Sequence, residues 1–164
     1  MEILQLKDIA CYLPYNLHLW DNVYSRRVIA MKFTVGYEFN NRHISIGWLW
    51  RNIDNGMKPI LRPISDLNKP FEDGAIPIVE LAKIGSPIET EWIVRNEISV
   101  VNKTKEYLFT FHLGDFKLLR TGCLDGAIPI IDQIQLFDYL NEHHFDYRGL
   151  IDKGLAIDIN TINE

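Results

Sequence analysis

The hexapeptide Asp-Gly-Ala-Ile-Pro-Ile occurs twice in this chain, at residues 73–78 and 125–130, and each copy is followed by an apolar residue and an acid. Asp-Gly is a turn signal. The proline fixes φ near its helical value and lacks the amide that a first helical turn leaves unpaired. Glu80 and Asp132 would then lie in the first turn, where the helix dipole favours negative charge. We therefore predict that both copies start a helix; the alternative is that they bind a partner.

The composition is that of a single globular domain. The chain has 164 residues, of which 47% are hydrophobic and 24% charged, close to the averages for such domains. We therefore expect one domain spanning residues 1–164, large enough to need no metal or disulfide for stability. Cys11 and Cys123 lack any ligand-like spacing and are interpreted as reduced thiols, with a disulfide as the alternative.

The net charge and the absence of known targeting and catalytic motifs argue against several classes of function. The amino terminus has no basic leader with an apolar core, and no segment approaches the roughly 18 apolar residues of a membrane span. We therefore predict a cytoplasmic protein with no membrane contact. The net charge of −5 argues against nucleic acid as a partner. The chain has no phosphate-binding glycine loop, GxSxG or HExxH motif, so we expect no cofactor and favour a non-enzyme.

Hydrophobic periodicity predicts strands and helices in alternation. In the first part of the chain we expect a short helix over 4–13, strands over 17–24, 28–39 and 43–50, and a tight hairpin at 40–42. The proline-rich segment 58–67 should be extended. Later we expect a helix from the first hexapeptide to Gly85, strands over 92–101 and 107–113, a long helix over 129–144, and a closing strand or extended tail near 155–159.

In the long helix, an inner stripe is expected from Ile130, Ile134, Phe137 and Leu140. The predicted class is α+β, with antiparallel sheet or sheets and one short and one long packed helix. Because strands precede a helix twice, a duplicated strand-strand-helix unit is a further hypothesis.

Three segments, Leu6–Tyr15, 58–67 and His144–Asn160, resemble a family of small uncharacterised proteins from gut Bacteroidetes genomes and their phages or prophages. The segments cover about a quarter of the chain. The resemblance implies a cytoplasmic bacterial or phage setting, and it implies no activity.

One acidic and histidine-containing cluster lies at the end of the long helix: Asp138, Glu142, His143, His144 and Asp146. Asp138 and Glu142 are one helical turn apart and could share a divalent ion. The alternative is a solvated helix end, with a histidine against the carboxyl-terminal dipole. Three further histidines lie on predicted strands and could converge, although isolated strand histidines are usually packing residues: His18, His43 and His112.

Three functions remain open. The first is a non-catalytic interaction or accessory protein of phage or mobile-element type, which binds a protein partner or self-associates through a sheet edge or an aromatic patch. The patch would contain Tyr12, Tyr15, Trp20, Trp50 and Tyr147. The second is a metal-dependent hydrolase or nuclease that uses the acidic cluster. The third is a structural or assembly component of a phage particle, which predicts concentration-dependent oligomers.

Overall fold

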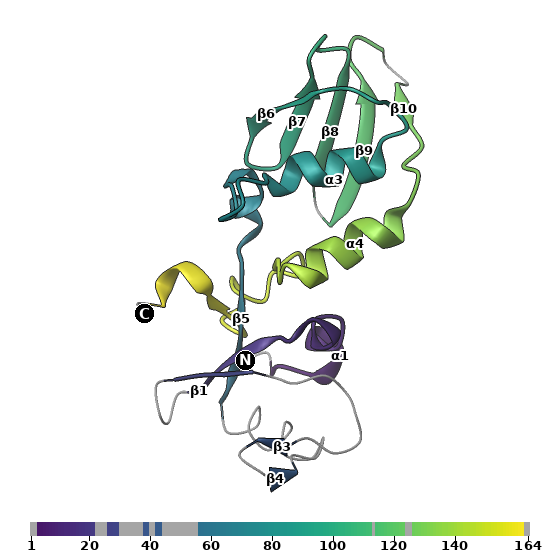
Figure 1. Cartoon of the computed structure of the whole chain (residues 1–164). Coiled ribbons are helices and arrows are strands. Elements are labelled where there is room, and N and C mark those ends of the chain that lie inside the picture. Colours follow the sequence, from purple (N-terminus) through teal and green to yellow (C-terminus); the bar gives the residue numbers. More distant parts are fainter. Residues whose placement is uncertain are drawn as a thin grey trace. The chain divides into compact units, whose positions relative to one another are not determined.

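The computed structural model describes residues 3–21, 26–29, 38–39, 42–43, 56–112, 114–123 and 126–162. Its fold is α+β with predominantly antiparallel sheets (Figure 1), as the sequence predicts. The chain forms two compact units: unit 1 combines residues 1–62 with 141–164, and unit 2 consists of 63–140. A single domain over 1–164 stays a prediction. Within the described ranges, no helix is long and apolar enough to cross a membrane.

Unit 1 contains a four-stranded sheet in the order β11-β5-β1-β2 and a separate hairpin, β3-β4. Its elements are α1 (Leu6–Ile9), the 3₁₀ helix η1 (Leu13–Tyr15), β1 (His18–Asp21), β2 (Arg26–Ile29), β3 (Glu38–Phe39), β4 (Arg42–His43), β5 (Lys58–Leu61), β11 (Ile157–Asp158) and the 3₁₀ helix η3 (Ile159–Thr161). Glu38 pairs with His43, which confirms the predicted hairpin. The closing strand is also confirmed, because β11 pairs with β5, in parallel.

The core of unit 1 comes from the amino-terminal segment and the tail. Ile9, Leu13 and Leu19 are fully buried, so the predicted amphipathic segment does face inward. Helix α1 is shorter than expected, and η1 then ends at Asn16, whose φ of 58° is left-handed. Asparagine tolerates this conformation, which redirects the chain into β1.

Unit 2 is built around a five-stranded antiparallel sheet in the order β10-β9-β8-β7-β6. Its elements are the 3₁₀ helix η2 (Ile64–Asn68), α3 (Pro77–Gly85), β6 (Trp92–Asn96), β7 (Ser99–Asn102), β8 (Tyr107–His112), β9 (Asp115–Arg120), β10 (Ala127–Ile128) and α4 (Gln133–Glu142), whose last two residues belong to unit 1. The segment 58–67 is extended only in its first half, because η2 begins at Ile64.

The first hexapeptide starts a helix as predicted. Pro77 is the first residue of α3, and Glu80 lies in its first turn. Upstream, Asp73 Oδ1 accepts a hydrogen bond from Ala75 N at 2.9 Å. Gly74 has a φ of +83°, which glycine adopts without strain. The turn and the proline therefore have the structural roles expected of them.

The second hexapeptide does not start a helix, so that prediction is wrong. Ala127 and Ile128 form β10 and pair with β9. Helix α4 begins later, at Gln133, after Asp132, whose Oδ1 accepts from Gln135 N at 3.0 Å. Asp132 therefore caps the helix rather than occupying its first turn. Available strand pairing with β9 overrides the local helix signal.

Two further expectations need correction. The segment 92–101 is two strands, because the chain turns at residues 97–98 between β6 and β7. Helix α4 is shorter than 129–144, and its buried stripe is rotated: Leu136 and Leu140 are fully buried, whereas Ile134 is 76% exposed. Phe137, expected in the core, is half-buried.

Aromatic rings and one glycine determine the packing of unit 2. Phe109 and Phe116 on neighbouring strands lie 5.7 Å apart, and Phe137 of α4 is 5.4 Å from Phe116. Helix α3 lies against the same sheet (Figure 1). Where it ends, a Cβ on Gly85 would be 2.9 Å from Phe109 Cε2 and 3.1 Å from Leu136 Cδ1. Only glycine allows this close approach.

Candidate functional site

The residues of the predicted metal site have separate environments. Asp138 and Glu142 are exposed on α4. Asp146 is only 6% exposed, and its two carboxylate oxygens accept hydrogen bonds from the amides of Leu150 and Ile151 at 2.9 and 2.7 Å. Asp146 therefore organises the turn that follows it.

His143 and His144 are half-buried and lie at one pocket, described below. Across the residues that the structure describes, no three histidine, cysteine or acidic side chains are grouped to hold a metal ion. The metal site stays a prediction that the described geometry does not support.

The predicted aromatic patch is also divided. Tyr12 is fully buried, and its hydroxyl donates to Phe145 O at 2.9 Å. Tyr15, Trp20 and Tyr147 are half-buried. Trp50 lies outside the described residues. Tyr12 therefore has a core role, and a partner-binding role for the set stays a prediction.

Tyr147 continues this cluster, because its ring lies 6.1 Å from that of Tyr12. Its hydroxyl is 3.6 Å from Cys11 Sγ. Both cysteine thiols are free, with Cys11 half-buried and Cys123 exposed, in line with the predicted reduced state. The aromatic residues near Cys11 thus join the first helix to the tail inside unit 1.

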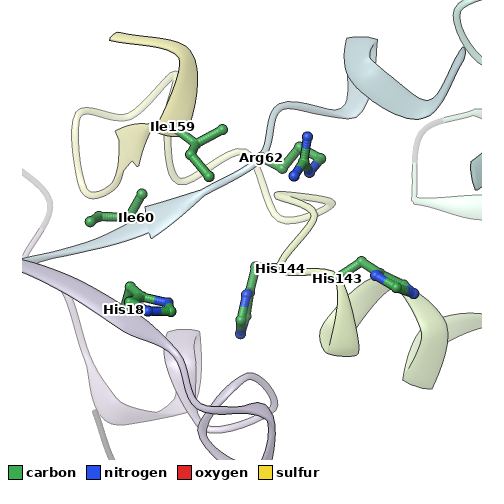
Figure 2. A pocket seen from close by; sticks show the side chains of 6 residues that line it. All are labelled: His18, Ile60, Arg62, His143, His144 and Ile159. Atoms are coloured by element: carbon green, nitrogen blue, oxygen red, sulfur yellow. The ribbon is translucent and has the colours of Figure 1, made fainter. Parts of the chain in front are cut away.

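One cavity of unit 1 gathers basic side chains from distant segments (Figure 2). We call it the histidine pocket. It has a volume of about 180 Å³ and is lined by His18, Ile60, Arg62, His143, His144 and Ile159. The rings of His18 and His144 are 6.3 Å apart and nearly perpendicular. Four of the six lining residues carry nitrogen donors or acceptors, and none is acidic.

The backbone around His144 builds the pocket. Arg62 N donates to His144 O, and Asp146 N donates to Arg62 O, both at 2.8 Å. Arg62 and Phe145 thus form a parallel bridge beyond β5. His144 has a φ of 57°, a left-handed conformation that is uncommon for residues with a side chain. This turn places the imidazole beside β1.

Burial determines the charge of His144. Burial lowers its pKa from 6.5 to about 4, and neighbouring His18 adds to this effect, while a hydrogen bond to the backbone of Tyr15 opposes it. The imidazole is therefore neutral at pH 7. Its Nε2 atom is buried and makes no hydrogen bond with any described residue.

A second candidate surface is the outer edge of the unit 2 sheet. No described strand pairs with the outer side of β6. Trp92 points into the core at 6% exposed, whereas Ile93 is 45% exposed. Glu91 and Arg95 are exposed as well, and the β6–β7 register shifts at Arg95, between Val94 and Asn96. An open edge with an apolar centre and flanking charges can pair with another strand.

The sequence identified these sites only in part. Of the strand histidines, His18 does join His143 and His144, while His112 is exposed in unit 2. The side chain of His43 is not among those that the structure describes. Arg62 was missed because it stands in a proline-rich connector, and nothing in its neighbourhood indicates a partner 82 positions along the chain.

Comparisons with known proteins give no further guidance. No family model, no curated protein and no solved structure matches this chain.

Proposed function

We propose that this protein is a non-catalytic interaction protein that self-associates through the open edge of β6. One observation supports the proposal: the exposed residues Glu91, Ile93 and Arg95 are an acid, an apolar residue and a base, an order that is complementary to itself when two copies run antiparallel. In an antiparallel pair centred on Ile93, each Glu91 lies opposite Arg95 of the second copy, and the two Ile93 side chains meet. Opposite charges and β-branched residues are favourable cross-strand neighbours.

The backbone of β6 has the right orientation for this pairing. Lys103 N donates to Glu91 O at 3.0 Å, so the polar groups of Glu91 face β7. In an antiparallel ladder the next residues alternate, and the register continues through Trp92 and Val94. The amide and carbonyl groups of Trp92 and Val94 therefore face the open edge. Each Trp92 can exchange two hydrogen bonds with Val94 of the second copy.

The expected association is weak. Each favourable cross-strand pair contributes roughly 0.2–1 kcal/mol, and the proposed interface has one isoleucine pair and two Glu91–Arg95 pairs. Glu91 also forms an ion pair with Lys103 at 2.8 Å, on the exposed surface, where such a pair contributes little. We therefore expect a concentration-dependent dimer rather than a permanent one.

Charge exchange across the strand provides the test. Glu91→Arg places two arginines opposite each other, and Arg95→Glu places two glutamates opposite each other, so each single variant should be monomeric. The double variant restores opposite charges and should dimerise like the wild type. Sedimentation equilibrium over a range of concentrations measures the dissociation constants.

Glu106→Arg is the matched control, because Glu106 is an exposed acid of the same unit that is outside the proposed pairing. It should dimerise like the wild type. The proposal fails if the wild type is monomeric at every concentration. It also fails if both single variants dimerise normally or if the double variant remains monomeric.

The setting proposed from the sequence resemblance is the cytoplasm of a bacterium of the Bacteroidetes type, in a host or phage genome. A two-fold pairing of one edge closes at the dimer. A phage structural component would instead form larger assemblies, so the same sedimentation data distinguish an accessory dimer from a particle component.

A further inference from the structure

We propose that Lys103 restrains the pairing of two β6 edges, because its ammonium group holds the Glu91 carboxylate that Arg95 of the second copy has to contact. The inference rests on the proposed β6 pairing and concerns the regulation of that pairing. Lys103 directly follows β7, the strand on the side of β6 opposite the open edge. It therefore acts on the dimer through Glu91 and has no place of its own in the paired edge.

Glu91 and Lys103 are cross-strand neighbours whose backbones and side chains are both joined. Lys103 N donates to Glu91 O at 3.0 Å, and Lys103 Nζ donates to Glu91 Oε2 at 2.8 Å. The side-chain hydrogen bond holds the carboxylate on the β7 side of its strand, away from the open edge. It is the main cause that lowers the pKa of Glu91 and raises the pKa of Lys103, so both groups are charged near pH 7.

In the proposed dimer each Glu91 lies between two cations, Lys103 of its own chain and Arg95 of the second copy. Neighbouring strands are about 4.8 Å apart, so these cations are roughly 10 Å apart. At about 0.1 M salt, repulsion over this distance between exposed groups is largely screened. The restraint therefore comes from the carboxylate itself, which has to share or release Lys103 before it makes full contact with Arg95.

The expected restraint is small, because the ion pair is exposed. The Lys103 and Glu91 side chains are 71% and 64% exposed, and such pairs are weak. A two-fold dimer contains the competition twice, however, and the two effects multiply. Removal of the lysine charge should therefore lower the dissociation constant of the dimer about two- to fivefold.

The test compares Lys103→Gln with the wild type by sedimentation equilibrium, and the variant should dimerise about two- to fivefold more tightly. Its net charge is more negative than that of the wild type, which by itself opposes association. Lys103→Arg keeps the cation and should dimerise like the wild type. Lys117→Gln is the matched control, because Lys117 is an exposed lysine on β9, away from β6 and β7, and it should not tighten the dimer.

A double-mutant cycle shows whether Lys103 acts through Glu91. Glu91→Gln removes the carboxylate for which the two cations compete, and it places no like charges opposite each other. In this background Lys103→Gln should leave the dissociation constant unchanged. An equal gain with and without the carboxylate would show that Lys103 acts in another way and would overturn the proposal.

The outcomes separate this inference from the β6 pairing on which it rests. If the wild type dimerises and Lys103→Gln is unchanged or weaker, the restraint is refuted and the pairing stands. The same holds if Lys117→Gln tightens the dimer as much as Lys103→Gln does. If the wild type and Lys103→Gln are both monomeric at every concentration, the pairing and the restraint are refuted together.

Discussion

The hydroxyl of Tyr12 offers the sharpest test of the unit 1 core. Tyr12 is fully buried, and its hydroxyl donates to Phe145 O at 2.9 Å. The same carbonyl also accepts from Tyr147 N at 3.0 Å. Tyr12→Phe therefore removes one neutral hydrogen bond but leaves the carbonyl with a partner, and the ring still fills its space.

The expected loss follows from this geometry. A neutral hydrogen bond contributes about 0.5–1.5 kcal/mol net, whereas an unsatisfied buried group costs about 1–3 kcal/mol. Because Phe145 O retains one bond, we expect Tyr12→Phe to lower the free energy of unfolding by about 1 kcal/mol. Truncation to alanine would also create a cavity and cost about 3–5 kcal/mol, by analogy with other large aromatic residues.

Urea denaturation of unit 1, followed by tryptophan fluorescence and circular dichroism, measures this difference. Tyr107→Phe in unit 2 is the matched control, because Tyr107 is half-buried and should change stability by less than about 0.5 kcal/mol. A loss above about 3 kcal/mol for Tyr12→Phe would show that the carbonyl is left unsatisfied. No loss at all would show that the hydrogen bond does not form.

Three further predictions concern other parts of the chain. Gly85→Ala should destabilise unit 2 in chemical denaturation, because overpacking against Phe109 costs about 1–3 kcal/mol and exceeds the roughly 1 kcal/mol gain in helix propensity; a stabilised variant would refute the close approach. Asp146→Asn should lower the thermal midpoint, at a cost of about 1–3 kcal/mol, because one of two backbone amides loses its acceptor. Burial lowers the pKa of His144, so as the pH falls the unfolded chain binds a proton at this histidine before the folded chain does. This contribution to the free energy of unfolding is therefore fully present above pH 6.5 and decreases towards pH 4. The partly exposed ring limits the loss to about 1–2 kcal/mol, and His144→Asn, whose side chain tolerates the positive φ, should abolish this part of the pH dependence in urea titrations.

The sequence predicted the secondary structure correctly where residues close together in the chain determine it. The Asp-Gly turn and Pro77 specify the start of α3, and the alternation of Tyr107 to Phe111 specifies β8. The second hexapeptide carries the same local signal, yet Ala127 and Ile128 pair with β9. Pairing with β9 determines its conformation. The hydrophobic periodicity of the sequence did not predict β9, because no element was expected over residues 115–120.

The prediction of which face of α4 is buried was wrong for a related reason. Ile134 and Leu136 are equally plausible core residues by composition, but they lie about 200° apart around a helix, so only one of them can face the core. Tertiary packing selects Leu136, which lies beside Gly85 at the end of α3, and Ile134 is exposed. The candidate sites depend still more on tertiary structure. Arg62 and His144 meet through a bridge that joins two distant segments, and no local pattern contains this information.

The discontinuity of unit 1 has a consequence for the order of synthesis. Residues 63–140 form unit 2 and are all translated before β11, the strand that pairs with β5. Until then, Leu13 and Leu19 have no complete core to enter, although they precede unit 2 in the chain. Vectorial synthesis therefore favours unit 2 as the first folded part. The segment that precedes unit 2 then remains unfolded for longer, and in that state chaperones and proteases have their best access to this protein.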